Sequence, residues 1–269
     1  MKKFIKIIIF FILYVTPLFF VGALPYGQLF ITYSIFTICL AFINLGDLIG
    51  LFANIRYARG RGSKTLYRLA ILKDTTSPTA YLNYAVLLMK NNDFVGALPH
   101  LKNARSINNQ IATDKNIALT LSICYMALGD IDYAITTLID LKEKYGYLSP
   151  STQAKLGYMY FLKKDIHMST ILLENVVETS PGMATAWDNL GQVYFYTNQF
   201  ERAIDAFKQA LSIEDDLIDS YYHLGLLYEN IDKLIAKKYF AKAFDSTCTV
   251  FNTTTLQMRN EKYTQYHEK

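Results

Sequence analysis

The sequence predicts an all-α protein in which two N-terminal transmembrane helices precede an α-solenoid of about five helix-turn-helix repeats. Three observations support this fold class. Two long apolar runs occupy the first 56 residues, Leu-Gly-x-x-Tyr blocks recur at a spacing of 34 residues, and small residues recur in the second half of the repeating unit. Helices satisfy the backbone hydrogen bonds of an apolar span internally, and stacked helix pairs share a continuous core.

The N-terminal region is predicted to form a transmembrane hairpin over residues 1–56, with spans at about 5–23 and 29–53. A span needs about 20 apolar residues, and both runs are long enough. Basic residues flank the outer ends of the hairpin, and the turn at 24–28 carries none. Because basic residues favour the cytoplasmic side, we expect an integral protein of the cell membrane with both termini and the repeat array in the cytoplasm.

The charge of the chain is divided unevenly along its length. Residues 1–64 hold seven Lys and Arg against one acidic residue, Asp47, whereas the remainder holds 20 basic and 22 acidic residues. The basic excess is therefore expected to contact the lipid bilayer, and no nucleic acid partner is expected. Asp47 is expected at the cytoplasmic interface, near Arg56. A signal peptide cleaved after 21–23 is the alternative, and the basic cluster at 56–64 opposes it.

The repeats are clearest in three Leu-Gly-x-x-Tyr blocks. These blocks begin at Leu156, Leu190 and Leu224, 34 residues apart, and weaker copies lie upstream at Tyr84 and Leu121. We expect repeats that start near residues 78, 115, 150, 184 and 218 in an array over 78–250, with a basic linker and lone helix at 57–77 and a C-terminal capping helix and tail at 251–269.

Small residues on both helices of a pair allow close approach of the two backbones, and large residues beside them fill the space between units. One helix pair cannot bury its apolar face alone, so stacking supplies the core. The residues assigned to this packing are Leu156, Gly157, Tyr160, Trp187, Leu190, Gly191, Tyr194, Ala203, Phe207, Ala210, Leu224, Gly225 and Tyr228.

This arrangement resembles the tetratricopeptide-repeat (TPR) family, whose Trp-x-x-Leu-Gly-x-x-Tyr…Ala-x-x-x-Phe…Ala…Pro pattern is met best from Trp187 to Ala210. The closing proline is matched only at Pro181, and Asp215 occupies its place in the best unit. The resemblance covers residues 78–244 and implies a TPR α-solenoid. It also implies that the first helix of each pair lines a concave surface that binds an extended peptide or a partner helix.

Carrying the inward-facing positions of the family onto this sequence gives an apolar and aromatic groove with an acidic C-terminal end. Lys155 is the only basic residue near the middle of this groove, and Lys90 lies at one edge of it. A carboxylate clamp, which uses several basic side chains, is therefore not expected. The expected partner is a protein or peptide with an apolar or amphipathic segment. The predicted groove residues are Leu82, Val86, Met89, Leu119, Ile123, Met126, Tyr158, Phe161, Leu162, Asp188, Gln192, Phe195, Tyr196, Tyr222, Leu226 and Glu229.

The sequence offers no pattern of catalytic or metal-binding residues. The four histidines are scattered, and the three cysteines are widely spaced without a metal-ligand motif. Residues 214–216 and Asp219 form a small acidic cluster, which is expected to be a solvated turn that caps the next helix. We therefore predict no enzyme, no metal and no cofactor.

The function predicted from sequence is that of a membrane-anchored TPR adaptor with a scaffolding or assembly role at the cytosolic face. The alternative is a peptide-responsive sensor or regulator that uses the same groove. Three further interpretations concern the groove itself. It is open to an external partner, or it is covered by the chain's own helix at 63–73, by the C-terminal segment or by the hairpin. In the third interpretation, the inward-facing positions are assigned out of phase with the helices.

Overall fold

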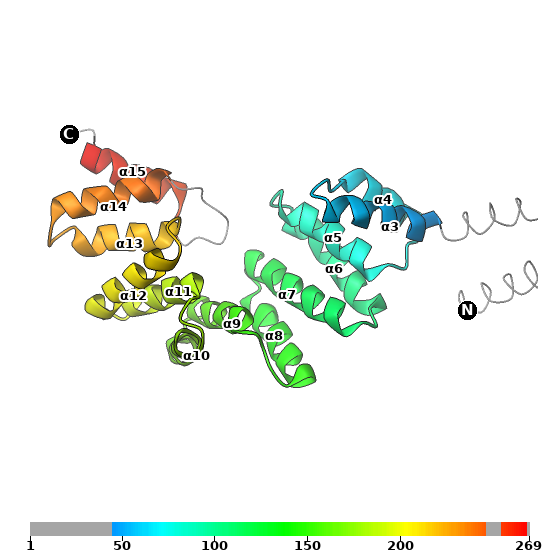
Figure 1. The fold of residues 1–269 in the computed structure, drawn as a ribbon, viewed down its shortest axis with the longest axis horizontal. Helices are drawn as coiled ribbons and strands as arrows, with labels where there is room; N and C mark the ends of the chain where they lie inside the picture. Colours follow the sequence, from blue (N-terminus) through cyan, green and yellow to red (C-terminus); the bar gives the residue numbers. More distant parts are fainter. Residues whose placement is uncertain (1–44, 246–253, 268–269) are drawn as a thin grey trace, which may run out of the picture. The chain divides into compact units, whose positions relative to one another are not determined.

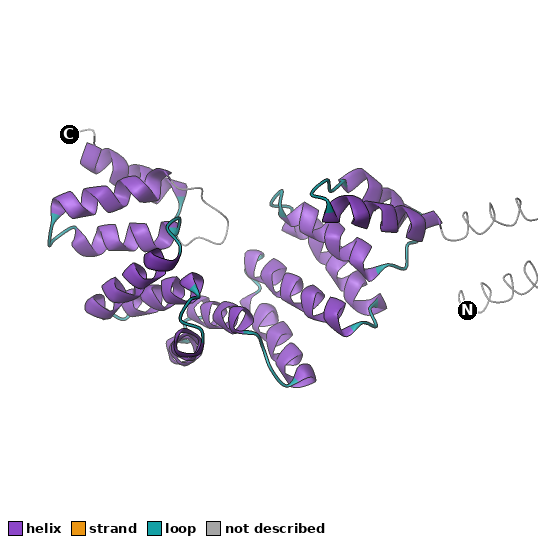
Figure 2. Cartoon of the chain, in the orientation of Figure 1, coloured by secondary structure: helices purple, strands orange, loops and turns teal. Residues whose placement is uncertain are grey.

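The computed structural model describes residues 45–245 and 254–267, and these residues form α-helices joined by short turns (Figures 1 and 2). The chain divides into two compact units, with the boundary between Leu87 and Leu88. The first unit contains α3 (Leu45–Ala58), α4 (Lys64–Leu72) and most of α5 (Pro78–Met89).

The first unit is held by close packing between α3 and α4. Gly46 and Gly50 of α3 are buried, and a Cβ atom at Gly50 would lie 3.3 Å from Ala80 Cβ in α5. The Tyr67 hydroxyl of α4 donates to Asn54 Oδ1 of α3 at 2.9 Å. The helix predicted to stand alone before the repeats is therefore one member of a helix pair.

Asp47 connects α3 to the loop before α5. Its Oδ1 accepts hydrogen bonds from Thr75 Oγ1 at 2.9 Å and from the Thr76 backbone N–H at 2.6 Å, and its Oδ2 accepts from Thr76 Oγ1 at 3.0 Å. The interpretation of Asp47 as a membrane-interface residue was wrong, because its carboxylate holds a turn of the folded unit.

The prediction of a transmembrane hairpin is also corrected. No helix in the described part of the chain is long and apolar enough to cross a membrane. The end of the predicted span at 29–53 lies in α3, which has 14 residues and buries Gly46, Gly50 and Ala53 within the first unit. The predicted span at 5–23 and residues 29–44 lie outside the described residues. The localisation at the cell membrane, with the termini and array in the cytoplasm, is corrected with the hairpin on which it rested.

The second unit consists of successive antiparallel helices in which consecutive elements pack together. Its first helix, α6 (Phe94–Ile107), packs against α7. The following pairs are α7 (Ile111–Ala127) with α8 (Ile131–Tyr145), α9 (Pro150–Leu162) with α10 (Ile166–Thr179), α11 (Ala184–Tyr196) with α12 (Phe200–Ile213), and α13 (Ile218–Tyr228) with α14 (Lys233–Asp245), before the final helix α15 (Leu256–His267).

Four of the five expected repeat starts coincide with the first residue of a helix, and one does not. α7 begins at Ile111, four residues before the expected start at 115, after Gln110 in an extended conformation. Asn108 Oδ1 accepts from the Gln110 backbone N–H at 3.2 Å, and this hydrogen bond forms a local turn between the end of α6 and the start of α7. The weak similarity of this unit to the others gave no residue with which to fix its start.

Left-handed residues end the first helix of several pairs. Asn92, Gly129, Lys164 and Asn198 have φ values of 60°, 84°, 70° and 59°. The next residue then caps the second helix where it has a suitable side chain, as when Asp165 Oδ1 accepts from the Met168 backbone N–H at 3.1 Å. Asn, Asp and Gly are favoured in such turns because their backbones reach these conformations at low cost.

The core of the second unit depends on glycine positions that face large side chains. A Cβ atom at Gly191 would lie 2.7 Å from Phe207 Cδ1, and one at Gly157 would lie 2.8 Å from Leu173 Cγ. The Phe207 ring also stacks on His223 of the next pair, with centroids 5.3 Å apart. Phe207 thus packs within its own pair as well as between units. Of the residues assigned to repeat packing, Tyr160, Trp187 and Tyr228 are half-buried and the others are buried.

Candidate partner-binding pocket

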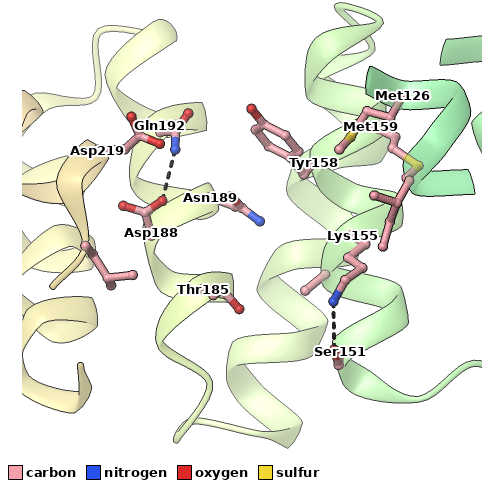
Figure 3. A pocket seen from close by; sticks show the side chains of 13 residues that line it. Met126, Ser151, Lys155, Tyr158, Met159, Thr185, Asp188, Asn189, Gln192 and Asp219 are labelled. Carbon is pink, nitrogen blue, oxygen red and sulfur yellow. Dashed lines mark hydrogen bonds between the residues drawn. The ribbon is translucent and has the colours of Figure 1, made fainter. Parts of the chain in front are cut away.

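A pocket of about 260 Å³ lies on the first helices of consecutive pairs in the second unit. Three of these helices, α7, α9 and α11, line it together with the beginning of α13 (Figure 3). None of the described second helices contributes a lining residue. The lining residues are Ile123, Met126, Ser151, Ala154, Lys155, Tyr158, Met159, Thr185, Asp188, Asn189, Gln192, Leu217 and Asp219.

One part of the pocket wall is apolar. Ile123 and Met126 come from α7 and Met159 from α9. Tyr158 stands beside them, with its ring 6.3 Å from that of Phe161 and an interplanar angle of 29°. Methionine side chains adapt to ligands of varied shape because they are unbranched and polarisable.

The facing part of the wall is polar and deeply buried. Asp188, Gln192 and Asp219 are 8%, 3% and 4% exposed. Gln192 Nε2 donates to Asp188 Oδ2 at 3.0 Å (Figure 3), and the Ser220 hydroxyl of α13 donates to Asp188 Oδ1. The backbone N–H of Thr254 donates to Asp219 Oδ1 at 2.8 Å. These hydrogen bonds fix the two carboxylates in place.

Burial shifts the ionisation of the groups around the pocket. It raises the pKa of Asp188 to about 7, the negative charge of Asp219 adds to this effect, and the hydrogen bonds from Ser220 and Gln192 oppose it. Burial also lowers the pKa of Lys155 and, with the two carboxylates, raises the pKa of Tyr158. The pocket therefore contains an acid that changes charge near neutral pH.

Lys155 belongs to a different part of the pocket from the carboxylates. Its Nζ donates to Ser151 Oγ at 3.0 Å, one turn earlier in α9. In Figure 3 the Lys155 side chain points toward Ser151 and away from the hydrogen bond between Asp188 and Gln192. The described residues include no group of three or more His, Cys, Asp or Glu side chains that could hold a metal ion.

The structure brings some of the predicted groove residues together in one pocket, namely Ile123, Met126, Tyr158, Asp188 and Gln192. Others have different surroundings. Phe161 and Phe195 pack against the core around α11 and α12, and Leu119 packs against the core around α8. Leu82 is buried, Val86, Met89 and Leu162 are half-buried, and Tyr196 is 51% exposed, and none of these lines the pocket.

The predicted acidic end of the groove is engaged by the chain's own C-terminal helix. Glu229 accepts hydrogen bonds from Lys262 Nζ at 2.7 Å and 2.8 Å and from the Tyr266 hydroxyl at 3.1 Å. Tyr222 is 5% exposed and belongs to a core cluster that Leu226 and Tyr266 pack against. α15 therefore covers Tyr222 and Glu229, and these residues do not extend the open pocket.

Several lining residues were absent from the predicted groove, although the repeat register contains them. Positions 151, 185 and 219 recur at the 34-residue spacing and are Ser, Thr and Asp. Positions 155 and 189 are likewise equivalent, as are 158 and 192. Continuing the groove toward the start of the first helices, by one turn in α11 and α13 and by two turns in α9, would have included Thr185, Asp219 and Ser151. Met159 and Leu217 had no such signal.

Two family descriptions match the second unit. "Tetratricopeptide repeat" matches residues 88–146, and "TPR repeat" matches residues 185–232. The chain contains tetratricopeptide repeats. These matches include α7 and α11, two of the helices that line the pocket, and they confirm the repeat type predicted from the Leu-Gly-x-x-Tyr blocks.

The chain is also similar to curated proteins and to solved structures. The BBSome complex member BBS4 homolog of Drosophila melanogaster is 20% identical over 190 residues, 71% of this chain and 37% of that protein. The peroxisomal targeting signal receptor of Saccharomyces cerevisiae is 25% identical over 93 residues, 35% of this chain and 15% of the receptor. The chain thus spans well under half of the length of these relatives. The solved structure of TTC0263, a TPR protein of Thermus thermophilus, covers 69% of this chain and 97% of TTC0263, with 21% identity and a TM-score of 0.56. This similarity is one of fold.

Proposed function

We propose that this chain is a protein-binding adaptor that holds a segment of its partner in the pocket on α7, α9, α11 and α13. The observation that carries the proposal is that the first helices of successive TPR pairs converge on a single concavity, whereas the described second helices do not reach it. A receptor for a targeting signal is among its relatives, which supports a role in recognising a protein segment. The proposed role is binding rather than catalysis.

The pocket lining favours a segment that is amphipathic. Ile123 and Met126 offer an apolar surface, and the polar groups of α11 lie opposite. Binding sites commonly combine an apolar lining with a few fixed polar groups that orient the ligand. The volume of about 260 Å³ accommodates one large side chain and its neighbouring backbone rather than a whole helix. We therefore expect one anchoring residue of the partner to enter the pocket.

The test is selection of peptides that depend on this pocket. The full chain is used to select binders from a displayed library of short random peptides, and their affinities are compared for the wild type and Thr185→Trp. Thr185 is exposed and lines the pocket, so an indole there blocks the pocket without disturbing the core. Thr136→Trp, at an exposed position of the second helix α8, is the matched control.

We expect peptides that bind the wild type and the Thr136→Trp variant alike and lose about tenfold or more in affinity with Thr185→Trp. Binders that are insensitive to Thr185→Trp would place the interaction elsewhere and contradict the proposal.

A further inference from the structure

The polar wall of the pocket contains a buried carboxylate that no cation of the described residues neutralises. The hydrogen-bond donors to Asp188 are the neutral groups of Ser220 and Gln192. Within the described residues, no Lys, Arg or His side chain forms an ion pair with Asp188. Burying an acid without a cation is costly, and the cost falls when a cation approaches.

The carboxylate of Asp219 lies in the same pocket lining as Asp188. Its charge is close enough to disfavour ionisation of Asp188. Both acids line a pocket that is open to a ligand rather than a sealed core. Lys155 forms no ion pair with Asp188 within the described residues, and its ammonium group donates to Ser151 Oγ instead. The pocket thus combines two buried acids with an apolar surface formed by Ile123 and Met126.

Lysine and arginine side chains have the chemistry that matches this lining. Each carries a cationic group at the end of an apolar methylene chain, and such chains pack along apolar surface while the head group finds polar partners. An ammonium or guanidinium group also forms charge-assisted hydrogen bonds with carboxylates, which are stronger than neutral ones.

We propose that the residue anchored in this pocket is a lysine or arginine of the partner, with its cation against Asp188 and beside Asp219 and its methylene groups against Ile123 and Met126. This inference rests on the proposed function and specifies the partner segment as amphipathic and basic. It reverses the charge preference of a carboxylate clamp.

The binding of such a residue depends on pH in a defined direction. The ionisable groups that line the pocket with Asp188 are Lys155 and Tyr158 on α9 and Asp219 on α13. His223 of α13 lies outside the lining, and its Nδ1 is 2.7 Å from the backbone oxygen of Asp219. Burial lowers the pKa of His223, so this side chain stays neutral to lower pH than an ordinary histidine and contributes less to the change around neutral pH. Ionisation of Asp188 near pH 7 therefore dominates the change, and affinity for a basic peptide increases between about pH 6 and pH 8.

The test uses the full chain and the displayed library of short random peptides. Binders are selected with the wild type, and those blocked by Thr185→Trp are sequenced and synthesised. We expect a Lys or Arg in them whose replacement by norleucine weakens binding about tenfold to a hundredfold. Asp188→Asn is expected to weaken the affinity for the basic peptide by a similar factor and to leave the affinity for the norleucine peptide unchanged.

Two further variants separate local charge from net charge and from folding. Asp216→Asn makes the same change of charge at an exposed position of the turn before α13 and is expected to leave affinity unchanged. Lys155→Gln removes the basic group of the pocket and is expected to strengthen binding of the basic peptide. A thermal unfolding curve for each variant verifies that it is folded at the temperature of the binding measurement.

The outcomes distinguish this inference from the proposed function. Pocket-dependent binders without a required basic residue would overturn the inference and leave the proposed function standing. Basic binders that weaken equally with Asp216→Asn and Asp188→Asn would also overturn it, because net charge alone would explain them. The lack of any binder sensitive to Thr185→Trp would overturn both.

Discussion

The ring of Phe207 lies against Gly191 so closely that a Cβ atom at Gly191 would be 2.7 Å from both Cδ1 and Cε1 of the ring. Both residues are buried, so the ring has little room to move. Gly191→Ala is therefore expected to lower the free energy of unfolding by about 1 to 3 kcal/mol, as overpacking of a core does. Urea unfolding followed by circular dichroism measures this change.

The matched control for this packing is Gly182→Ala, because a Cβ atom at Gly182 would have no neighbour within 4 Å. Phe207→Leu in the Gly191→Ala background is expected to recover part of the loss, since Ser122 and Leu138 occupy the equivalent positions in another pair. Equal effects of the two glycine substitutions on the free energy of unfolding would show that the close contact between Gly191 and Phe207 does not cause the loss of stability.

Asp188 is expected to destabilise the fold at neutral pH. Its carboxyl has a pKa of about 7 in the fold against 3.8 in its ordinary state. Between these values the unfolded chain releases the proton and the folded chain keeps it, so stability falls as the pH rises from about 4 to about 7. Asp188→Asn removes this loss of stability, because an amide does not ionise. In the variant the Gln192 side-chain amide turns so that its oxygen accepts from the Asn side chain.

The stability of Asp188→Asn and of the wild type should therefore be compared across pH. We expect little difference near pH 4 and a gain for the variant of about 1 to 3 kcal/mol at pH 8. Urea midpoints at several pH values give the result. A variant that is less stable than the wild type at pH 8 would mean that the hydrogen bonds of the carboxylate outweigh its burial.

Glu229 has the opposite dependence on pH. Burial would raise the pKa of this carboxyl, but the hydrogen bonds from Lys262 and Tyr266 outweigh burial and lower it. Its stabilising effect is therefore present above the ordinary value of 4.5 and is lost as the pH falls through the lower value in the fold. Glu229→Gln is expected to cost about 1 to 2 kcal/mol at neutral pH and little in acid.

Hydrogen exchange of the α15 amides at neutral pH measures this cost locally. Lys262→Gln should add little to Glu229→Gln, because both substitutions break the same ion pair. Additive effects of the two substitutions would contradict the assignment of Glu229 as the residue that holds α15.

The N-cap residues of the second helices are expected to differ in their contribution to the free energy of unfolding. Asp165 accepts from the Met168 backbone N–H at 3.1 Å, whereas Asp130 precedes α8 at the equivalent position without such a side-chain hydrogen bond. Asp165→Ala is expected to cost about 1 kcal/mol and Asp130→Ala much less. Thermal unfolding of the two variants decides the comparison, and equal losses would show that the side-chain hydrogen bond is not the cause.

The sequence was a good guide to the repeats because their register is set by local packing. A glycine in the Leu-Gly-x-x-Tyr block and a large residue on the following helix, such as Gly191 and Phe207, must occur together for the pair to close. The sequence was a poor guide to α3, because the apolar run that contains Gly46 and Ala53 does not indicate whether protein or lipid surrounds it. Their burial within the first unit became evident only from the structure.

The pocket could be predicted only in part. The resemblance to the TPR family implied that the first helices line the groove, and it supplied some of the inward positions, including Met126 and Gln192. It could not show where those helices leave space, because this depends on distances between pairs. Nor could it show that α15 reaches Glu229, since that contact joins residues 33 positions apart outside the repeat pattern.

The central claim, that a partner segment enters this pocket, is tested most directly by NMR of the full chain with 13C-labelled methionine methyl groups. Met126 and Met159 line the pocket, whereas Met183 precedes α11 and Met258 lies in α15. Titration with a selected peptide is expected to shift the Met126 and Met159 signals and leave those of Met183 and Met258 in place. Shifts confined to Met183 or Met258, with Met126 and Met159 unchanged in the saturated complex, would contradict the claim.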